Sequence, residues 1–187
     1  MQELTLENTR VRLLPLTMEN HSLLLPVASQ KKLVQYSPSD IETSEAFQNY
    51  VKMALQKKAQ QTAVPFLVYD KRIDANAGCT RYMNIDPKNK VLEIGSTWIG
   101  REFQGTGLNS AMKHLMIQNA FLTMGYEKVE FRIDERNIRS RKAVEKLGAS
   151  LEGVLRKNVY LLDGYKRNTC CYGLLKEEWK FEPYTEK

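Results

Sequence analysis

The sequence of 187 residues contains few of the side chains that build disulfide frameworks or metal sites. It has three cysteines, Cys79, Cys170 and Cys171, and the last two are adjacent and cannot easily bond to each other. So small and odd a number argues against a disulfide-stabilised secreted domain and fits a reducing cytoplasm. The two histidines, His21 and His114, belong to no His/Cys cluster, so the sequence predicts no metal site.

The sequence also lacks an apolar run long enough to cross a bilayer. Its first ten residues, MQELTLENTR, show neither the basic nor the apolar region of a signal peptide. We therefore expect a cytoplasmic location and no membrane association. The length suits one sizeable domain and is short for two, so we predict a single domain over residues 1–187.

The net charge of the sequence limits the classes of binding partner. A net charge of +6 is a modest excess, and no segment interleaves aromatic and basic side chains, so nucleic acid is not favoured. Between residues 132 and 146 six basic residues stand against three acidic ones: Arg132, Arg136, Arg139, Arg141, Lys142 and Lys146 against Asp134, Glu135 and Glu145. Such a run fits either a solvated helix face or a surface that binds phosphate groups.

The apolar pattern predicts a mixed α/β domain with the element order βααβββαβαββ on one sheet. Strands are expected at about 9–14, 64–69, 77–85, 91–99, 129–133, 150–161 and 165–175, with Asp163-Gly164 joining the last two as a tight hairpin. Helices are expected at 17–27, from Thr43 or Ser44 onward, at 108–124 and at 137–147.

The most informative stretch is the strand Val91–Ile99, which is followed by a glycine-bearing turn and a helix from Leu108. Gly105 and Gly107 permit backbone angles and close approaches that a Cβ would block. A helix that begins right after such a turn presents unpaired N–H groups and the positive end of its dipole. These groups suit an anion, so the turn predicts a phosphate-bearing ligand on residues 104–109.

Two other phosphate-binding loops can be tested against these residues. A Walker loop requires Gly-Lys-Ser/Thr, whereas Gly107 is followed by Leu108 and Asn109, which excludes it. A dinucleotide fingerprint is nearly met by Gly105, Gly107 and Ser110, but its third glycine is missing and the stretch lies in the middle of the chain. The dinucleotide interpretation stays open as the weaker alternative.

The segment 104–109, QGTGLN, resembles the Q/R-x-x-G-x-G/A pyrophosphate loop of the GNAT acetyltransferase superfamily, with Asn109 in place of the final Gly/Ala. The preceding LEIGSTWI looks like the superfamily's central strand. The stretch from Asn137 to Ala149 resembles its N-x-x-S-x-x-x-x-x-K-x-G-F segment, with Ala149 replacing the usual aromatic residue. The pattern is most similar to the RimJ/RimL-like branch of protein N-acetyltransferases, and the resemblance extends from about Thr9 to Trp179.

The resemblance implies a mostly antiparallel twisted sheet with splayed central strands and flanking helices. It also implies an N-acetyltransferase that moves the acetyl group of acetyl-CoA to a primary amine, on a protein N-terminus or a small molecule, by direct attack in a ternary complex. Glu93 is then the candidate base, although a strand glutamate usually lies on the solvated face or pairs with a neighbouring Arg or Lys. Ser140 is the candidate acid near the sulfur, because the tyrosine of many members falls at Val144, which cannot donate a proton.

The implied contacts with the cofactor come from the central strand, the loop and the later helix. They are Trp98, Ile99, Gln104, Gly105, Thr106, Gly107, Leu108, Asn109, Asn137, Ser140, Arg141 and Lys146. The basic residues between 132 and 146 would form a rim for the coenzyme A phosphates. The implied acceptor contacts are Leu33, Tyr36, Phe47 and Tyr172. Plainer interpretations exist, since Asn137 is a good helix cap and buried aromatic residues pack well without a ligand.

Strict alternation along the central strand would place Glu93, Gly95, Thr97 and Ile99 on one face and Ile94, Ser96 and Trp98 on the other. Two other functions stay open. One is a protein that binds acyl-CoA without catalysis, and the less favoured one is a basic RNA-binding protein. No motif identifies the amine acceptor, and a homodimer is left open.

Overall fold

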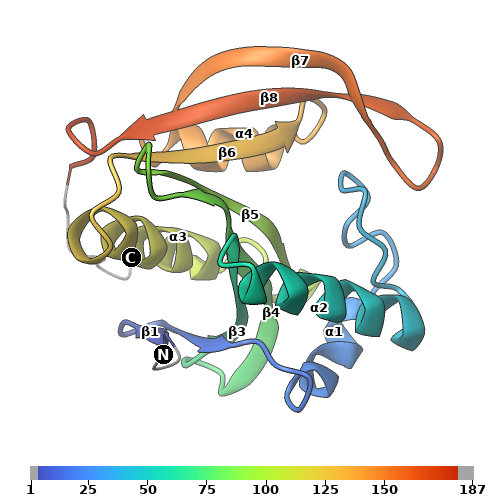
Figure 1. Cartoon of the computed structure of the whole chain (residues 1–187). Helices are drawn as coiled ribbons and strands as arrows, with labels where there is room; N and C mark the ends of the chain where they lie inside the picture. Colours follow the sequence, from blue (N-terminus) through green and yellow to red (C-terminus); the bar gives the residue numbers. More distant parts are fainter. Residues whose placement is uncertain (1–3, 181–187) are drawn as a thin grey trace.

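The computed structural model describes residues 4–180, in which eight strands form one twisted sheet (Figure 1). The strands are β1 (Leu6–Glu7), β2 (Val11–Pro15), β3 (Ala63–Asp70), β4 (Ala75–Asp86), β5 (Val91–Ile99), β6 (Lys128–Asp134), β7 (Ser150–Tyr160) and β8 (Lys166–Leu175). Their order across the sheet is β1-β2-β3-β4-β5-β6-β8-β7, and only the β5–β6 pair is parallel. The predicted mixed α/β fold with a mostly antiparallel sheet is confirmed.

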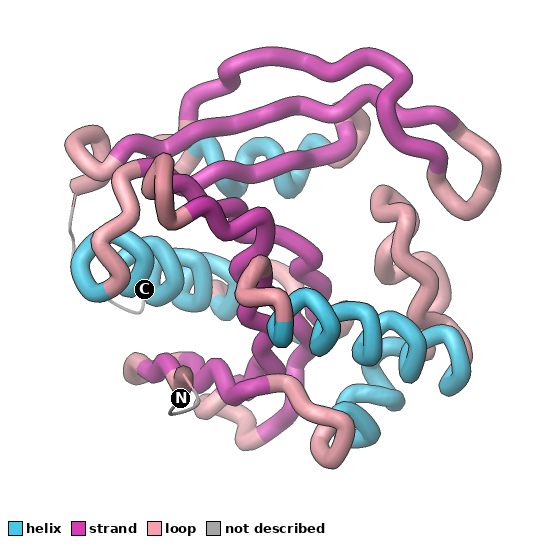
Figure 2. The backbone as a smooth tube through the Cα atoms, in the orientation of Figure 1, coloured by secondary structure: helices cyan, strands magenta, loops and turns pink. Residues whose placement is uncertain are grey.

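Helices cover both faces of this sheet (Figure 2). They are α1 (Leu25–Ala28), α2 (Ser44–Ala59), α3 (Leu108–Gln118) and α4 (Ile138–Glu145), with short 3-10 turns at His21–Leu24 and Arg101–Phe103 and a π-helical turn at Asn119–Thr123. The α2 helix packs on one face of β3–β5, whereas α3 and α4 pack on the opposite face (Figure 1). None of the helices within residues 4–180 is long and apolar enough to span a bilayer.

Side-chain caps set where two of the helices begin. The Thr43 hydroxyl accepts a hydrogen bond from the backbone N–H of Ala46 at 3.1 Å, so α2 begins at Ser44. The Asn137 side chain accepts one from the backbone N–H of Ser140 at 3.2 Å, and α4 follows it. The cap expected at Asn137 is therefore confirmed.

The helix predicted over 17–27 is wrong in its extent. The Asn20 side chain accepts from the backbone N–H of Thr17 at 2.9 Å and donates to the carbonyl of Pro15 at 2.8 Å, which holds the chain in a turn. A single 3-10 turn follows, and then the four-residue α1 begins with Pro26 in its first turn. Proline lacks an N–H donor and disfavours a helical residue before it, so a continuous helix cannot run through this position.

The two central strands of the sheet separate soon after they pair. Residues Val91–Glu93 of β5 pair with Lys128–Glu130 of β6, and the remaining residues of β6 pair only with β8. Figure 1 shows β5 turning away from β6 toward the N-terminus of α3. The structure thus has the splayed central strands that the resemblance implied.

Candidate active site

A bulge in β5 determines which of its side chains face α2 and which face α3. Ser96 has a left-handed φ of +47°, and two residues of β5 stand opposite Thr80 alone, because Arg81 pairs with Gly95 and Cys79 with Trp98. After the bulge, Thr97 accepts a hydrogen bond from Lys113 of α3 at 2.7 Å. The faces predicted by strict alternation are therefore wrong from Ser96 onward.

Trp98 lies on the α2 face, where its indole N–H donates to the Tyr50 hydroxyl at 3.3 Å. Gly95 lies on this face too, because it pairs with Arg81, whose guanidinium lies over the Tyr50 ring of α2. Glu93 lies beside it, since a Cβ added at Gly95 would meet Glu93 Oε1 at 3.0 Å. The bulge thus brings Glu93 and Trp98 to one side of the sheet, which the alternating pattern had separated.

Glu93 is a buried carboxylate with 5% of its surface exposed. The Asn84 side chain donates to its Oε2 at 2.7 Å, and Arg132 Nε lies 3.6 Å from the same oxygen. Burial raises the pKa of Glu93 above its ordinary value, and the opposing effects of Asn84 and Arg132 are weaker. A carboxyl group held this way takes up a proton more readily than an exposed glutamate does.

The segment Gln104–Gly107 forms a loop between β5 and α3. Both glycines have left-handed φ values, +79° for Gly105 and +88° for Gly107, so glycine is needed at each. No atom lies within 4 Å of where a Gly105 Cβ would be, and Gly107 is the N-terminal cap of α3. The loop therefore has an open approach to the positive end of the helix dipole.

Neighbouring elements hold this loop in place on both sides. The Gln104 amide donates to the Ile99 carbonyl at 3.0 Å, and Arg139 of α4 donates to Gln104 Oε1 at 2.6 Å. Leu108 is fully buried and anchors the first turn of α3, whereas Asn109 is half-buried beside it.

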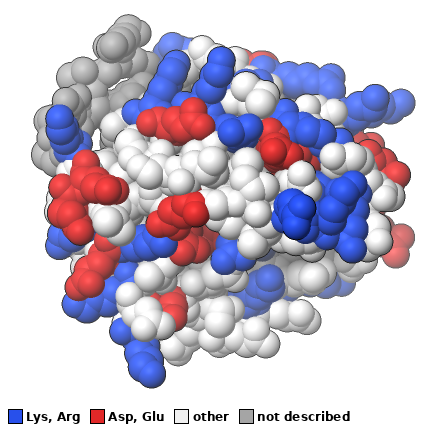
Figure 3. All heavy atoms as spheres, turned by 90° about the horizontal axis from the view of Figure 1, so that it is seen from above, with Lys and Arg blue, Asp and Glu red and all other residues white. Residues whose placement is uncertain are grey.

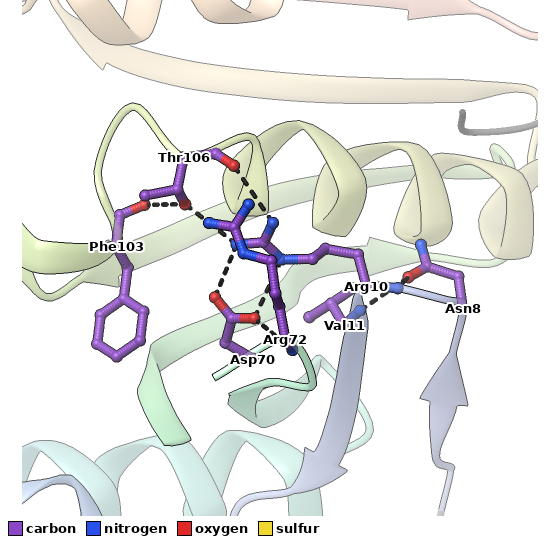
Figure 4. A network of polar contacts seen from close by, with 7 residues as sticks. All are labelled: Asn8, Arg10, Val11, Asp70, Arg72, Phe103 and Thr106. Atoms are coloured by element: carbon purple, nitrogen blue, oxygen red, sulfur yellow. Dashed lines mark hydrogen bonds and ion pairs between the residues drawn. The ribbon is translucent and has the colours of Figure 1, made fainter. Parts of the chain in front are cut away.

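A buried arginine fixes Thr106 from the other side (Figure 4). Arg10 donates to the carbonyl and to the hydroxyl of Thr106, both at 3.3 Å, and Thr106 in turn donates to the Phe103 carbonyl at 2.8 Å. Asp70 accepts from Arg10 Nε at 3.0 Å and from Nη2 at 2.8 Å. The N-terminal strands thereby position the loop that the sequence singled out as a phosphate site.

The helix α4 places the remaining predicted cofactor residues on the α3 face. Ser140 is half-buried in its first turn and Lys146 is exposed at its end. Arg141 donates to the Tyr172 hydroxyl at 3.0 Å and to the Glu135 carbonyl at 3.1 Å. Tyr172 is buried beneath α4, so the structure does not bring it together with the other predicted acceptor residues.

Those other acceptor residues lie on the α2 side. Phe47 is fully buried and packs edge-on against Trp98 with ring centroids 5.7 Å apart. Leu33 and Tyr36 are half-buried in the segment before α2, and Arg167 of β8 donates to the Tyr36 carbonyl at 2.7 Å. This contact joins the segment before α2 to the last hairpin, so the two form one wall.

Two buried cations near the bulge were missed in the sequence, because neither belongs to a motif. Lys113 is 5% exposed, and burial lowers its pKa to about 7, although Glu93 acts in the opposite direction. Arg81 of β4 is also 5% exposed and lies over the Tyr50 ring at 4.6 Å. A lysine in a helix and an arginine in a strand carry no sequence signal of burial, since both are usually exposed.

Two structural findings bear on the other ligand classes. Within residues 4–180 no group of three His, Cys, Asp or Glu side chains could hold a metal ion. Figure 3 shows that acidic side chains are interspersed among the basic ones on the face formed by β7 and β8. That face lacks the single-sign surface that typically holds nucleic acid.

Comparison with known proteins agrees with this arrangement. Residues 10–150 match the family description of the acetyltransferase (GNAT) domain. The chain is 33% identical over 116 residues to a Bacillus subtilis protein named "Putative ribosomal N-acetyltransferase YdaF"; the match covers 62% of this chain and 61% of that protein. Fold and family match together define an acetyltransferase domain. The chain belongs to the GNAT acetyltransferase family, which confirms the predicted membership.

Solved structures give the same assignment. A GCN5-related N-acetyltransferase from Brucella melitensis is 27% identical, with a TM-score of 0.86 over 96% of this chain and 81% of that one. The microcin C7 self-immunity acetyltransferase MccE, solved with acetyl-CoA and AMP, is 22% identical with a TM-score of 0.77 over 90% of this chain and 93% of that one. At that identity the likeness to MccE concerns the fold.

Proposed function

We propose that the chain is an acetyl-CoA-dependent N-acetyltransferase of the RimJ/RimL type that acts on a primary amine in the cytoplasm. The observation that carries the proposal is Glu93, a buried carboxyl group with a raised pKa at the last β5–β6 pair, where the central strands of a GNAT fold separate. The acetyl-CoA bound to MccE and the name of the Bacillus subtilis relative support the choice of reaction.

The cofactor would lie along the separated strands. Its pyrophosphate meets the backbone N–H groups of residues 105–109 at the N-terminus of α3, with Arg139 and Gln104 beside them. The pantetheine arm follows Trp98 and Ile99 toward Glu93. The first turn of α4, from Asn137 to Arg141, borders the arm on the α3 face, and exposed Lys146 adds positive charge at its far end.

The reaction needs a neutral amine, a polarised carbonyl and a stabilised leaving group. The amine nitrogen attacks the thioester carbon, so a C–N bond forms and the C–S bond breaks. Glu93 accepts the proton that the nitrogen loses, directly or through one water. The coenzyme A thiolate leaves and takes a proton from the Ser140 hydroxyl, which regains one from solvent while Glu93 releases its proton to solvent. The products are the N-acetylated amine and coenzyme A.

The first test replaces the base. We expect Glu93→Gln to lower the turnover of amine acetylation by about 10²–10⁴-fold, since general-base catalysis has that size. Glu127→Gln is the matched control, because Glu127 is exposed and pairs only with Lys90 among the described residues. Turnover is measured as free thiol released, and acetyl-CoA affinity by calorimetry, with NAD as the competing ligand.

Three outcomes would count against the proposal. Unchanged turnover in Glu93→Gln would place the base elsewhere. Heat from NAD and none from acetyl-CoA would restore the dinucleotide interpretation. Acetyl-CoA binding without turnover on any amine would favour a protein that binds acyl-CoA and does not catalyse.

A further inference from the structure

Arg81 is a buried arginine, and the edge of its guanidinium formed by Nε and Nη2 makes no hydrogen bond to the described residues. Only 5% of its surface is exposed. Burying a charge is costly unless a counter-charge pairs with it, so such a cation calls for a ligand. No sequence pattern marks this arginine, because it lies inside an ordinary strand segment.

The chain itself shows what this edge of an arginine binds. Arg10 uses Nε and Nη2 for the two oxygens of Asp70, at 3.0 and 2.8 Å. Arg136 uses the same two atoms for Asp134, at 3.1 and 2.8 Å. Nε and Nη2 form the flat fork that matches a carboxylate with two parallel hydrogen bonds. In Arg81 the same fork is unpaired.

The groups packed around Arg81 do not supply the missing anion. Its guanidinium lies over the Tyr50 ring, and Cys79 is the other titratable neighbour. Burial raises the pKa of both the Tyr50 hydroxyl and the Cys79 thiol, so each is uncharged at neutral pH. The nearest ladder position with a carboxylate is Glu93, which instead binds Asn84 and Arg132.

Arg81 lies on the face of the sheet that also carries Glu93 and Trp98. Arg81 pairs with Gly95, and the neighbouring Met83 pairs with Glu93, so Arg81 and Glu93 are diagonal neighbours on adjacent antiparallel strands. Such neighbours have Cα atoms roughly 7–8 Å apart. An amine beside Glu93 and a carboxylate at Arg81 thus match the two ends of a small amino acid.

We propose that Arg81 binds the carboxylate of the acceptor, so that the substrate is a small primary amine that carries a carboxylate, such as a free amino acid. The inference rests on the proposed acetyl transfer and names its substrate class. One arginine with neutral neighbours balances one negative charge, which favours a carboxylate over a dianionic phosphate. A polyamine would place a second cation beside Arg81, and like charges repel.

The test compares wild-type kcat/KM for a panel of L-amino acids with that for their carboxamides. The amide keeps the amine and the shape and loses only the anion, and its amine is the less basic of the two. We expect the acid to be preferred by about 10²-fold or more, since a site built for a polar group rejects an analogue without it. An aminoalkyl phosphate and spermidine complete the panel.

Arg81→Gln should reduce the acid-to-amide ratio to about 1 and leave the KM for acetyl-CoA unchanged. Arg156→Gln is the control, because Arg156 is exposed on β7 and should keep the wild-type ratio. Thermal melting establishes that Arg81→Gln is folded. If it is not folded, the wild-type ratio alone decides.

Each result supports or overturns the inference. Equal rates for acid and amide, or a preference for spermidine, would overturn it while acetyl transfer stood. A preference for the phosphate over the carboxylate would overturn the choice of anion. If no amine is acetylated, calorimetry on the coenzyme A complex compares N-acetyl amino acids with their amides, and equal binding of the two overturns it.

Discussion

Lys113 is a buried cation that the fold stabilises poorly. Its side chain donates a hydrogen bond to Thr97, and burial lowers its pKa from 10.5 to about 7, with Glu93 opposing the shift. The unfolded chain therefore binds this proton more tightly than the folded one. Stability is reduced at and below pH 7, recovers as the pH rises toward 10.5, and is no longer affected above that value.

We expect Lys113→Met to raise the free energy of unfolding by on the order of 3 kcal/mol at pH 6 and by much less at pH 10, after allowing for the lost hydrogen bond to Thr97. Urea unfolding at the two pH values measures the difference. Lys90→Met is the control, because Lys90 is exposed and paired with Glu127. An equal change at pH 6 and pH 10 would show that folding does not lower the pKa of Lys113.

Single residues could be predicted from the sequence where a local pattern encloses them. Asn137 could be predicted as a helix cap, because capping depends on a neighbour three residues away. Glu93 could be predicted as the candidate base through the family resemblance, but its burial is visible only in the structure. The burial of Arg81 and Lys113 could not be predicted, since it depends on contacts with other elements. Arg81 packs on Tyr50 of α2, and Lys113 donates to Thr97 of β5.

At the scale of elements, the ion pair between Arg10, just before β2, and Asp70, at the end of β3, holds the loop of residues 104–107. Both side chains are at most 1% exposed. Removing one partner of a buried ion pair costs about 3–5 kcal/mol. We expect Asp70→Asn to lower the melting temperature by roughly 10 °C. It should also raise the KM for acetyl-CoA more than it lowers kcat, because Arg10 would no longer hold Thr106.

Thermal melting and steady-state kinetics check both parts. Glu7→Gln serves as the control: Glu7 also pairs with an arginine of β2, Arg12, but at the surface, where such pairs contribute little. A lower melting temperature with an unchanged KM would mean that the ion pair stabilises the sheet without positioning the loop.

Helices and strands could be predicted where a local sequence pattern, such as regular apolar spacing or a turn motif, is uninterrupted. The apolar stripe of Phe47, Tyr50, Val51 and Ala54 gave α2, and the Asp163-Gly164 turn gave the last hairpin. The prediction of a helix over 17–27 was wrong because Asn20 and Pro26 impose a turn that the apolar spacing does not indicate. The predicted face of Trp98 was wrong because one left-handed residue, Ser96, shifts the alternation. Serine rarely adopts that conformation.

At the scale of the whole molecule, the sheet consists of two parts that meet at one short ladder. The β1–β5 part and the β6–β8 part pair only through Val91–Glu93 and Lys128–Glu130. Beyond it, the facing backbone edges of β5 and β6 do not pair with each other. A ligand that lies between these edges would link the two parts and reduce their local opening.

Hydrogen exchange followed by mass spectrometry tests this arrangement. We expect acetyl-CoA to slow amide exchange in residues 94–99, in residues 104–109 and in the first turn of α4, because these are the segments on which the cofactor would lie. The β1–β2 pair should exchange at the same rate with and without ligand, since it lies at the far edge of the sheet. Gly107→Trp should abolish the protection. Protection confined to the surface cavity lined by Asn89, Glu127 and Lys128 would instead place the ligand at the opposite end of β6, and the splayed strands would then have no part in binding.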